Sequence, residues 1–399
     1  MGEPLRDLPV VRSMGGVLEY TSTDIPLDSD SGNAGAPTSA LPSVPAEIFR
    51  VRGGDRIRLR TPAQHRSTGE TSWTTVDIPT DYPAGLHWHH PQVASSPARL
   101  PGLVIVEGDI DDLDGITHAR ERTMVLAPAG SLPGQVTPPP PPPPATGEPP
   151  MTPRPTLPAT LTTAVNGQIL PDIDIQPGEI QRWRIVNTEP ERAIWLHVEG
   201  HSMYQIGQDG VPFTQPRATH AVMLHPGNRA EVLVRATKPG RYRVYAERYH
   251  QGDPGGVRPT ALLATMAVAG RPIFNRLPRT LGADPVEPTG SVAVRRTAHV
   301  GADPRGAGPR AVVDGNVTDL DRLARRGTTG TVEEWTLVND DTVQHPVHAG
   351  GYWFHVMDVQ GVPAGDPSWQ ASPHVWWDTY RLPPKGQVTL RVYLRAGIS

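Results

Sequence analysis

The chain has 399 residues, which is enough for two or three domains of ordinary size, and its formal net charge is -4. With 20% charged residues and no basic run, the composition excludes a nucleic-acid footprint and a polybasic membrane patch, and no apolar stretch reaches the roughly 20 residues that span a bilayer. The N-terminus has no apolar core of a signal peptide, so as written we expect a cytoplasmic protein, or a secreted or periplasmic one if this is a processed form.

The first 130 residues form one predicted block of short β-strands. Apolar and polar residues alternate there with the period of two that is typical of strands, and no segment has a convincing helical period. The 47 prolines and 40 glycines of the chain also suit a turn-rich β protein. Strands are predicted at Glu47–Val51, Asp55–Arg60, Ser72–Ile78, Gly85–His90, Gly102–Glu107 and Glu121–Leu126.

A proline-rich segment follows this block. Pro138–Pro144 are seven consecutive prolines, which adopt only the extended polyproline II conformation. The surrounding residues 131–158 are therefore predicted to be a semi-rigid linker. The alternative function of such a run is that of a ligand for aromatic grooves.

Three segments of the chain resemble one another. Residues 54–60, 178–187 and 330–339 each open with glycine and continue as an alternating strand; in the second of them Trp183 and Ile185 fall on one face and Arg182 and Arg184 on the other. Such self-similarity predicts one β-sandwich used three times. The expected domains are residues 1–130, 159–270 and 291–399, with linkers at 131–158 and 271–290.

The repeat also predicts an incomplete third domain. In the second block Gly227 and Gly240 each start a strand and lie thirteen residues apart. In the third block Gly386 starts the corresponding strand, and thirteen residues later comes Ser399, the last residue of the sequence. A missing strand leaves backbone groups unpaired, so we expect a third domain of marginal stability or a homo-oligomer formed through it.

Two histidines follow the strand of the third block. His345 and His348 flank Pro346 and Val347 directly after the alternating segment 331–339. Histidine is the commonest metal ligand, and imidazoles held by a rigid scaffold suit copper or zinc. Alternatively, both histidines only cap and pack a loop.

This stretch resembles the third copper motif of bacterial multicopper oxidases, the laccase-type enzymes built from three cupredoxin domains. That family has His-Pro-x-His-x-His, and Gly350 stands in place of the last histidine here. Residues 83–92 resemble the family's second motif, Trp-x-His-x-His. Matching Trp88 puts His90 on the first ligand position and Gln92 on the second.

The resemblance therefore implies a metal-ligand set of His90, His345 and His348. His345 belongs to the position that would face a blue copper centre, so we expect it to lie apart from the other two. A further ligand could come from His87, His89 or His355, although packing or solvent-facing roles are the alternative for the first two. The family's first motif, His-x-His, is absent from the interval before Trp73.

The chain has no cysteine, which bears most strongly on function. A blue copper centre needs a thiolate beside two imidazoles, and in the family that centre is where electrons enter from the substrate. We therefore expect an all-β chain of three cupredoxin-like Greek-key β-sandwich domains, the third truncated, with degenerate copper centres, at most one mononuclear copper site, and no laccase cycle. The alternative is a non-oxidase binding or partner protein, or a redox-neutral enzyme that uses the old substrate pocket. The sequence identifies neither catalytic residues nor a small-molecule substrate.

Overall fold

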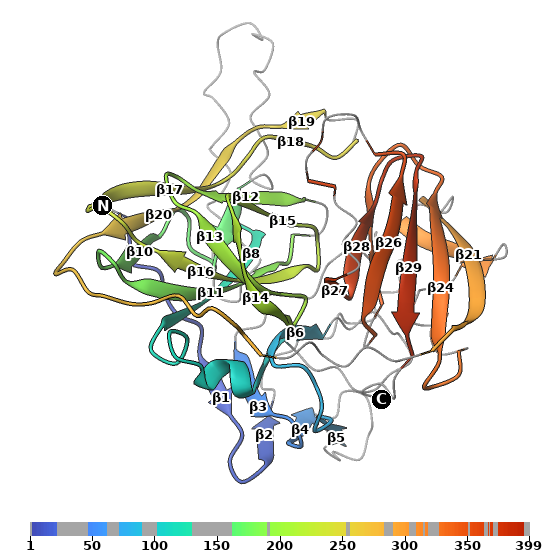
Figure 1. The fold of residues 1–399 in the computed structure, drawn as a ribbon, viewed down its shortest axis with the longest axis horizontal. Coiled ribbons are helices and arrows are strands. Elements are labelled where there is room, and N and C mark those ends of the chain that lie inside the picture. The colour runs from blue at the N-terminus through green and yellow to red at the C-terminus, as the bar shows by residue number, and fades with distance from the viewer. Residues whose placement is uncertain are drawn as a thin grey trace, which may run out of the picture.

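The structure is a computed structural model of the chain. It describes residues 2–21, 47–61, 72–89, 102–129, 162–189, 192–252, 256–282, 290–302, 309–313, 316–317, 327–349, 352–362, 366, 368–369 and 374–394. Within these residues the regular structure consists of β-strands and one short 3-10 helix, η1 (Asp109–Asp112), and no helix is long and apolar enough to cross a membrane. Figure 1 shows three groups of strands, named here the first unit (β1–β7), the middle unit (β8–β20) and the third unit (β21–β29).

The first unit consists of two small sheets. One has the order β1-β3-β7-β6 and the other β2-β4-β5. Alternation places apolar residues of both sheets in a shared core that includes Leu18, Phe49, Ile57 and Val104. The bounds are β1 (Val10–Arg12), β2 (Val17–Thr21), β3 (Ile48–Arg52), β4 (Arg56–Thr61), β5 (Ser72–Asp77), β6 (Gly85–His89) and β7 (Gly102–Glu107). The first five predicted strands of this block are therefore present.

The middle unit pairs a six-stranded sheet, β14-β13-β16-β11-β8-β9, with a five-stranded sheet, β10-β20-β17-β12-β15. Its strands are β8 (Arg120–Pro128), β9 (Thr163–Val165), β10 (Asp172–Ile175), β11 (Ile180–Asn187), β12 (Ile194–Val198), β13 (Met203–Gln208), β14 (Val211–Thr219), β15 (Ala221–Leu224), β16 (Arg229–Arg235), β17 (Gly240–Ala246), β18 (Tyr249–His250), β19 (Val257–Arg258) and β20 (Ala261–Val268). Strand β8 precedes the predicted boundary at residue 130, yet it pairs in parallel with β11 beyond it. The domain boundary itself stays a prediction.

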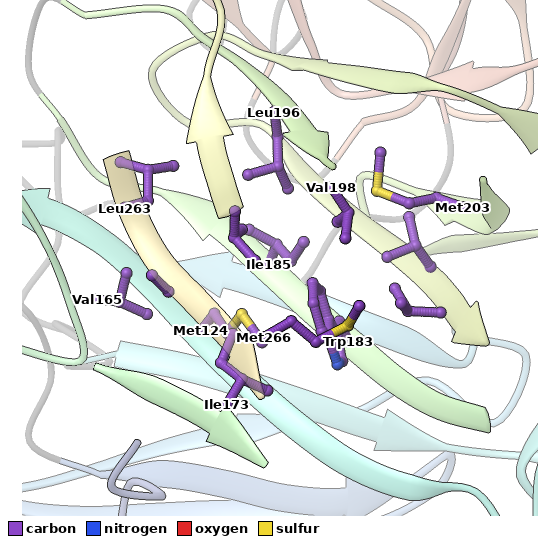
Figure 2. Close-up of a cluster of buried hydrophobic side chains, with 14 of the residues drawn as sticks. Met124, Val165, Ile173, Trp183, Ile185, Leu196, Val198, Met203, Leu263 and Met266 are labelled. Carbon is purple, nitrogen blue, oxygen red and sulfur yellow. The ribbon is translucent and has the colours of Figure 1, made fainter. Parts of the chain in front are cut away.

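The largest hydrophobic core lies between the two sheets of the middle unit (Figure 2). Trp183 and Ile185 of β11 point into it and are fully buried, as their alternation predicts. Removing the Trp183 side chain would cost about 3–5 kcal/mol, because a cavity would remain. Arg182 and Arg184, on the opposite face, are also buried, and both guanidinium groups are bonded at 2.6 Å to Glu231 of the neighbouring strand β16.

The third unit has a seven-stranded sheet, β23-β22-β21-β24-β29-β26-β27, and a two-stranded sheet, β25-β28. Its strands are β21 (Val292–Ala302), β22 (Pro309–Val313), β23 (Asn316–Val317), β24 (Val332–Asn339), β25 (His345–His348), β26 (Phe354–Gln360), β27 (Trp376–Trp377), β28 (Thr379–Leu382) and β29 (Gln387–Tyr393). Trp335 and Leu337 of β24 are fully buried in the core of this unit. Strand β29 pairs with β24 on one side and with β26 on the other, so its backbone is engaged within its own sheet. Oligomer formation through this unit stays a prediction.

The middle and third units repeat the same pairing pattern. In the middle unit β8 pairs in parallel with β11, which pairs antiparallel with β16, which pairs with β13. In the third unit β21, β24, β29 and β26 pair in the same order and directions. The pair β12–β15 likewise corresponds to β25–β28. This agreement confirms the predicted similarity of the second and third glycine-led segments; the threefold use of one sandwich stays a prediction.

Candidate functional site

His345 and His348 lie on β25, which pairs antiparallel with β28. Residues three apart on a strand point to opposite faces, so the two imidazoles are directed away from each other. His345 is buried, and its Nε2 lies 3.1 Å from a carboxylate oxygen of Asp341. The pattern His-Pro-Val-His therefore does not by itself bring two ligands to one ion.

His348 is held by β28 and the residue before it. Its Nδ1 lies 2.8 Å from the hydroxyl of Thr379 and 3.6 Å from a carboxylate oxygen of Asp378. The Thr379 hydroxyl donates its only proton to Asp378 at 2.8 Å, so its oxygen accepts from the Nδ1–H of His348. This tautomer puts the lone pair on Nε2, the orientation in which metal-ligating histidines are usually held.

Packing contacts surround His87 of β6. The ring is buried, lies 4.7 Å from Tyr82 and 6.0 Å from Trp353 between ring centroids, and has Nε2 2.9 Å from the carbonyl oxygen of Pro83. A Cβ atom at Gly210 would lie 2.3 Å from this ring, so only glycine fits opposite it. His87 thus joins the first unit to the other two.

The remaining candidate ligands are also distributed. His355 is buried with its ring 4.0 Å from that of Trp376 and its Nδ1 3.3 Å from the hydroxyl of Tyr393; burial lowers its pKa to about 4. The backbone of His89 ends β6, and His90 lies outside the described residues. Among the residues that the structure describes, no group of three or more His, Cys, Asp or Glu side chains has a geometry that could hold a metal ion.

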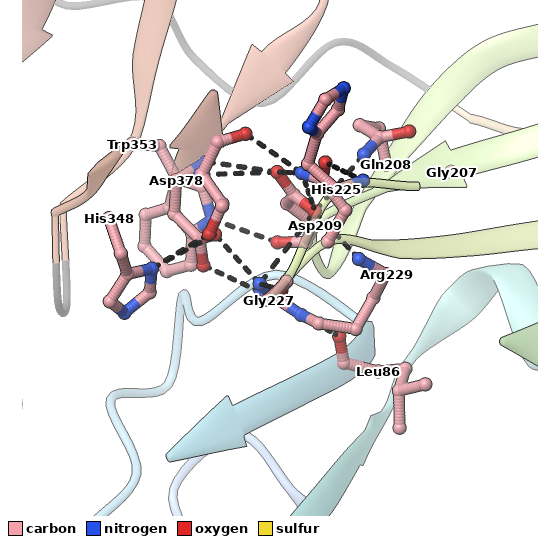
Figure 3. Close-up of polar contacts among 12 residues, drawn as sticks. Leu86, Gly207, Gln208, Asp209, His225, Gly227, Arg229, His348, Trp353 and Asp378 are labelled. Atoms are coloured by element: carbon pink, nitrogen blue, oxygen red, sulfur yellow. Dashed lines mark hydrogen bonds and ion pairs between the residues drawn. The ribbon is translucent and has the colours of Figure 1, made fainter. Parts of the chain in front are cut away.

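A cluster of buried charges joins the three units where the copper motifs were expected to meet (Figure 3). Arg229, at the start of β16, donates from Nη1 and Nη2 to the two carboxylate oxygens of Asp378 at 2.7 and 2.6 Å. Its Nε donates to the carbonyl oxygen of Leu86 in β6 at 3.3 Å. A single side chain of the middle unit therefore binds both the third and the first unit.

Asp209 is the second acid of this cluster and has no solvent exposure. It occupies the tight turn between β13 and β14 with a φ of 47°, a left-handed conformation that Asp tolerates and that the following Gly210 extends. Its carbonyl oxygen accepts from Nε1 of Trp353 at 3.2 Å. The Asp-Gly turn is visible in the sequence, but its burial against the third unit is not.

The carboxylate of Asp209 is lined by hydrogen-bond donors. The backbone N–H of Arg229 lies 2.9 Å away, and the N–H groups of Thr379 and Asp378 lie 3.2 and 3.4 Å away. Burial and the neighbouring Asp378 raise the pKa of Asp209 to about 7, against the lowering effect of Arg229 and of the hydrogen bond from the Asn228 side chain. Burial also disfavours the charged form of Asp378, but its two bonds to Arg229 hold the pKa of that carboxyl below the ordinary value.

A second polar contact between the middle and third units surrounds Arg381 of β28. Its guanidinium stacks 3.6 Å above the ring of Trp369 and contacts the Tyr249 hydroxyl and, at 3.0 Å, Nε2 of His225. Burial and this cation hold the pKa of His225 well below its ordinary value, so the imidazole is neutral. Sequence patterns gave no signal for this contact, because His225 and Arg381 are 156 residues apart.

Comparisons with known proteins agree on the family. Two family models described as multicopper oxidase match residues 144–269 and 288–397. A multicopper oxidase from Campylobacter jejuni superposes with a TM-score of 0.68 at 17% identity, over 99% of this chain and 90% of that one. The McoA multicopper oxidase from Aquifex aeolicus superposes with a TM-score of 0.67 at 16% identity, over 99% of this chain and 93% of its own. These likenesses confirm the predicted all-β, cupredoxin-like fold.

Curated relatives carry two different names. Cell division protein FtsP from Photorhabdus laumondii is 28% identical over 249 residues, which are 58% of this chain and 48% of that protein. A laccase from Bacillus stratosphericus is 25% identical over 210 residues, 49% of this chain and 39% of its own length. The chain thus spans half or less of the length of these relatives.

Proposed function

This chain belongs to the multicopper oxidase family, and we propose that it is a non-oxidase member with degenerate copper centres that acts as a binding or partner protein. The observation that carries the proposal is the absence of cysteine from all 399 residues. A blue copper site takes a thiolate and two imidazoles, and neither the Asp nor the Thr residues near His345 and His348 replace a soft sulfur ligand. The residues present therefore do not fit a blue centre.

The contacts of the candidate histidines support loss of the multinuclear centre as well. His345 is engaged with Asp341, His87 is packed against Trp353, and His355 lies in an aromatic cluster. His348 is the described histidine whose Nδ1 contact suits a ligand role, and His90 is the partner that the sequence motifs provide. Two imidazoles form a weak site, so the chain has room for at most one copper ion, bound weakly.

The name of the FtsP relatives, cell division protein, supports a role other than that of an oxidase. Several relatives of that name, from different bacteria, match over about 58% of this chain at 26–28% identity. The buried ion pairs of Arg229 also support a role as a binding protein. They fill the region where the family's copper motifs would converge with hydrogen-bonded side chains, which make this junction rigid. The partner is a protein of unassigned identity, and no small-molecule substrate is proposed.

Copper titration into chelator-stripped protein tests this proposal. We expect no intense blue absorption, no oxygen-dependent turnover of phenols by metal-analysed protein, and at most one weakly bound ion. His348→Ala and His90→Ala should each abolish that binding, whereas His118→Ala, an exposed histidine on the turn before β8, should leave it unchanged. Sustained phenol oxidation at stoichiometric copper would refute the non-oxidase assignment. Tight copper binding that survives both substitutions would refute the location of the site.

A further inference from the structure

We propose that the groove beside β10 in the middle unit is a peptide-recognition site for an extended segment of a partner protein that carries leucine and, two residues later, a carboxylate. In this chain residues 3–7 occupy the groove and show what it accepts; the N-terminal end of the chain lies beside β10 and β20 in Figure 1. The inference rests on the proposed role as a binding protein and adds the chemistry of the partner.

Residues 3–7 extend the edge of a sheet. Strand β10 is an edge strand of the five-stranded sheet, and Asp172 makes two backbone hydrogen bonds to the segment. The N–H of Asp172 donates to the carbonyl oxygen of Glu3 at 2.7 Å, and its carbonyl oxygen accepts from the N–H of Leu5 at 2.8 Å. This is the parallel pattern by which an extended peptide adds a strand to an open sheet edge. Pro4, between the two bonded residues, needs no N–H toward β10.

The side chain of Gln168 is committed to the backbone of the segment. It is buried, its Oε1 accepts from the N–H of Arg6 at 2.7 Å, and its Nε2 donates to the carbonyl oxygen of Pro4 at 3.0 Å. Asn166, in the tight turn before Gln168, donates to the carbonyl oxygen of Arg6 at 2.9 Å. A vacated groove would leave the buried amide of Gln168 without these partners, which is costly, so the groove favours an occupant that restores both bonds.

Side chains of the segment are recognised as well. Leu5 is 5% exposed and enters the core between the two sheets of the middle unit. The two carboxylate oxygens of Asp7 lie 2.9 and 3.0 Å from Nη1 of Arg122 in β8, whose guanidinium is buried. A Cβ atom at Gly2 would lie 2.8 Å from the carbonyl oxygen of Leu170, so a side chain is disfavoured there. The groove thus selects the pattern Gly-x-x-Leu-x-Asp.

Exposed apolar residues beside the groove favour a partner as its second occupant. Ile169 and Leu170, in the loop that leads into β10, are 51% and 40% exposed. Leu170 adjoins the position of Gly2, so a partner segment with large aliphatic residues before its glycine would cover both side chains. Such a segment would bury apolar surface that residues 3–7 leave exposed, and it would compete with them for the groove.

Peptide binding to a chain with a weakened segment tests the inference. Leu5→Ser and Asp7→Asn, made together in the full chain, should loosen residues 3–7. A fluorescent peptide with the sequence of residues 2–9 should then bind this double variant about tenfold or more tightly than it binds the parent chain, whose own tethered segment competes with the peptide. Fluorescence anisotropy measures both affinities.

Substitutions in the peptide test which side chains are recognised. Leu5→Ala and Asp7→Asn in the peptide should each weaken binding about tenfold or more, because one removes buried apolar surface and the other a charge-assisted bond. Arg6→Ala is the matched control, since the Arg6 side chain is exposed and pairs with Glu3 of the same segment. Equal affinities of all three variants would overturn the recognition pattern.

Lengthening the peptide tests the partner. A peptide extended by Val-Leu before the glycine should bind the double variant several-fold more tightly than one extended by Ser-Ser, because the aliphatic side chains cover Ile169 and Leu170. Equal affinities of the two extended peptides would overturn the assignment to a partner with apolar residues at these positions.

A measurement on the parent chain covers the case in which the double variant does not fold. The N–H groups of Leu5 and Arg6 are bonded to Asp172 and Gln168, so excess unlabelled peptide should displace the segment and speed hydrogen exchange at both amides, but not at the amide of Trp183 in the core. These readouts do not depend on copper, so their failure would leave the non-oxidase assignment standing. No peptide binding to a folded double variant, or unchanged exchange in the parent, would overturn the recognition site. A dimer of the parent chain that the peptide dissociates would assign the groove to a second copy and overturn the partner.

Discussion

The guanidinium of Arg229 and the carboxylate of Asp378 face each other in a two-bond, fork-like pair that joins the middle unit to the third. Both side chains are buried, so the pair is not screened by solvent. The same guanidinium also donates to the carbonyl oxygen of Leu86 in the first unit. The side chain of Arg229 is therefore bonded to the first and the third unit at once (Figure 3). Its loss should therefore be felt throughout the molecule.

Replacing Arg229 tests this expectation. Arg229→Leu leaves Asp378 and Asp209 buried without their cation, and we expect a loss of about 3–5 kcal/mol in the free energy of unfolding. Urea unfolding followed by tryptophan fluorescence measures the loss. Arg56→Ala, which removes an exposed pair with Asp77, is the control and should have little effect. Equal effects of the two substitutions would mean that the junction does not hold the units together.

Gly210 should not tolerate a side chain. Its φ is +81°, and an added Cβ would lie 2.3 Å from the His87 ring, so Gly210→Ala should cost about 1 kcal/mol from backbone strain and about 1–3 kcal/mol more from the clash. Gly330 has a similar φ of +86°, and no atom lies within 4 Å of a Cβ added there, so Gly330→Ala measures the backbone strain alone. The melting temperature of Gly210→Ala should be well below that of Gly330→Ala. Adding His87→Ala to Gly210→Ala should recover part of the difference; no recovery would contradict the proposed contact.

The contact between η1, which carries Asp111, and β11 of the middle unit should weaken in acid. Burial raises the pKa of Asp111, but the guanidinium groups of Arg182 and Arg184 lower it more, so the net shift is downward. A lowered carboxyl pKa contributes stability that is present above about pH 4 and is lost as the pH falls through the folded-state value. We expect Asp111→Asn to lower the free energy of unfolding at pH 7. Below pH 4 the variant should lose less of its remaining stability than the parent protein does. Unfolding curves at pH 3 and 7 for both proteins measure this; an unchanged acid loss in the variant would exclude Asp111 as a contributor.

Metal removal should leave the fold unaffected. The described side chains of the three units are joined by ion pairs and cores rather than by a metal-ligand cluster, so prolonged chelation should not change the melting temperature. Calorimetry of chelated and copper-loaded protein checks this result. A rise of several degrees on copper loading would indicate a site that binds the folded state preferentially, in contrast to the weak binding proposed here.

Local patterns predicted the secondary structure well. The alternation in residues 180–187 and 332–339 placed Trp183 and Trp335 in two separate cores, and the shared glycine-led start predicted that β11 and β24 occupy equivalent positions. These predictions succeed because strand formation and the choice of inward face depend on side chains two residues apart. The cysteine count likewise needs no fold, because only cysteine supplies a thiolate ligand, wherever the fold places it.

The junction could not be predicted in this way. Arg229 and Asp378 are 149 residues apart, and Asp209 and Thr379 are 170 apart, so no periodicity or motif connects them. The sequence alone determined an all-β, repeated, cysteine-free chain, because those properties belong to composition and to neighbouring residues. Only the tertiary structure decided that His345 and His348 point to opposite faces of β25, and that one guanidinium is shared between two buried acids. Whether a charged side chain is buried depends on which surfaces of the three units pack against each other, and only the tertiary structure determines this.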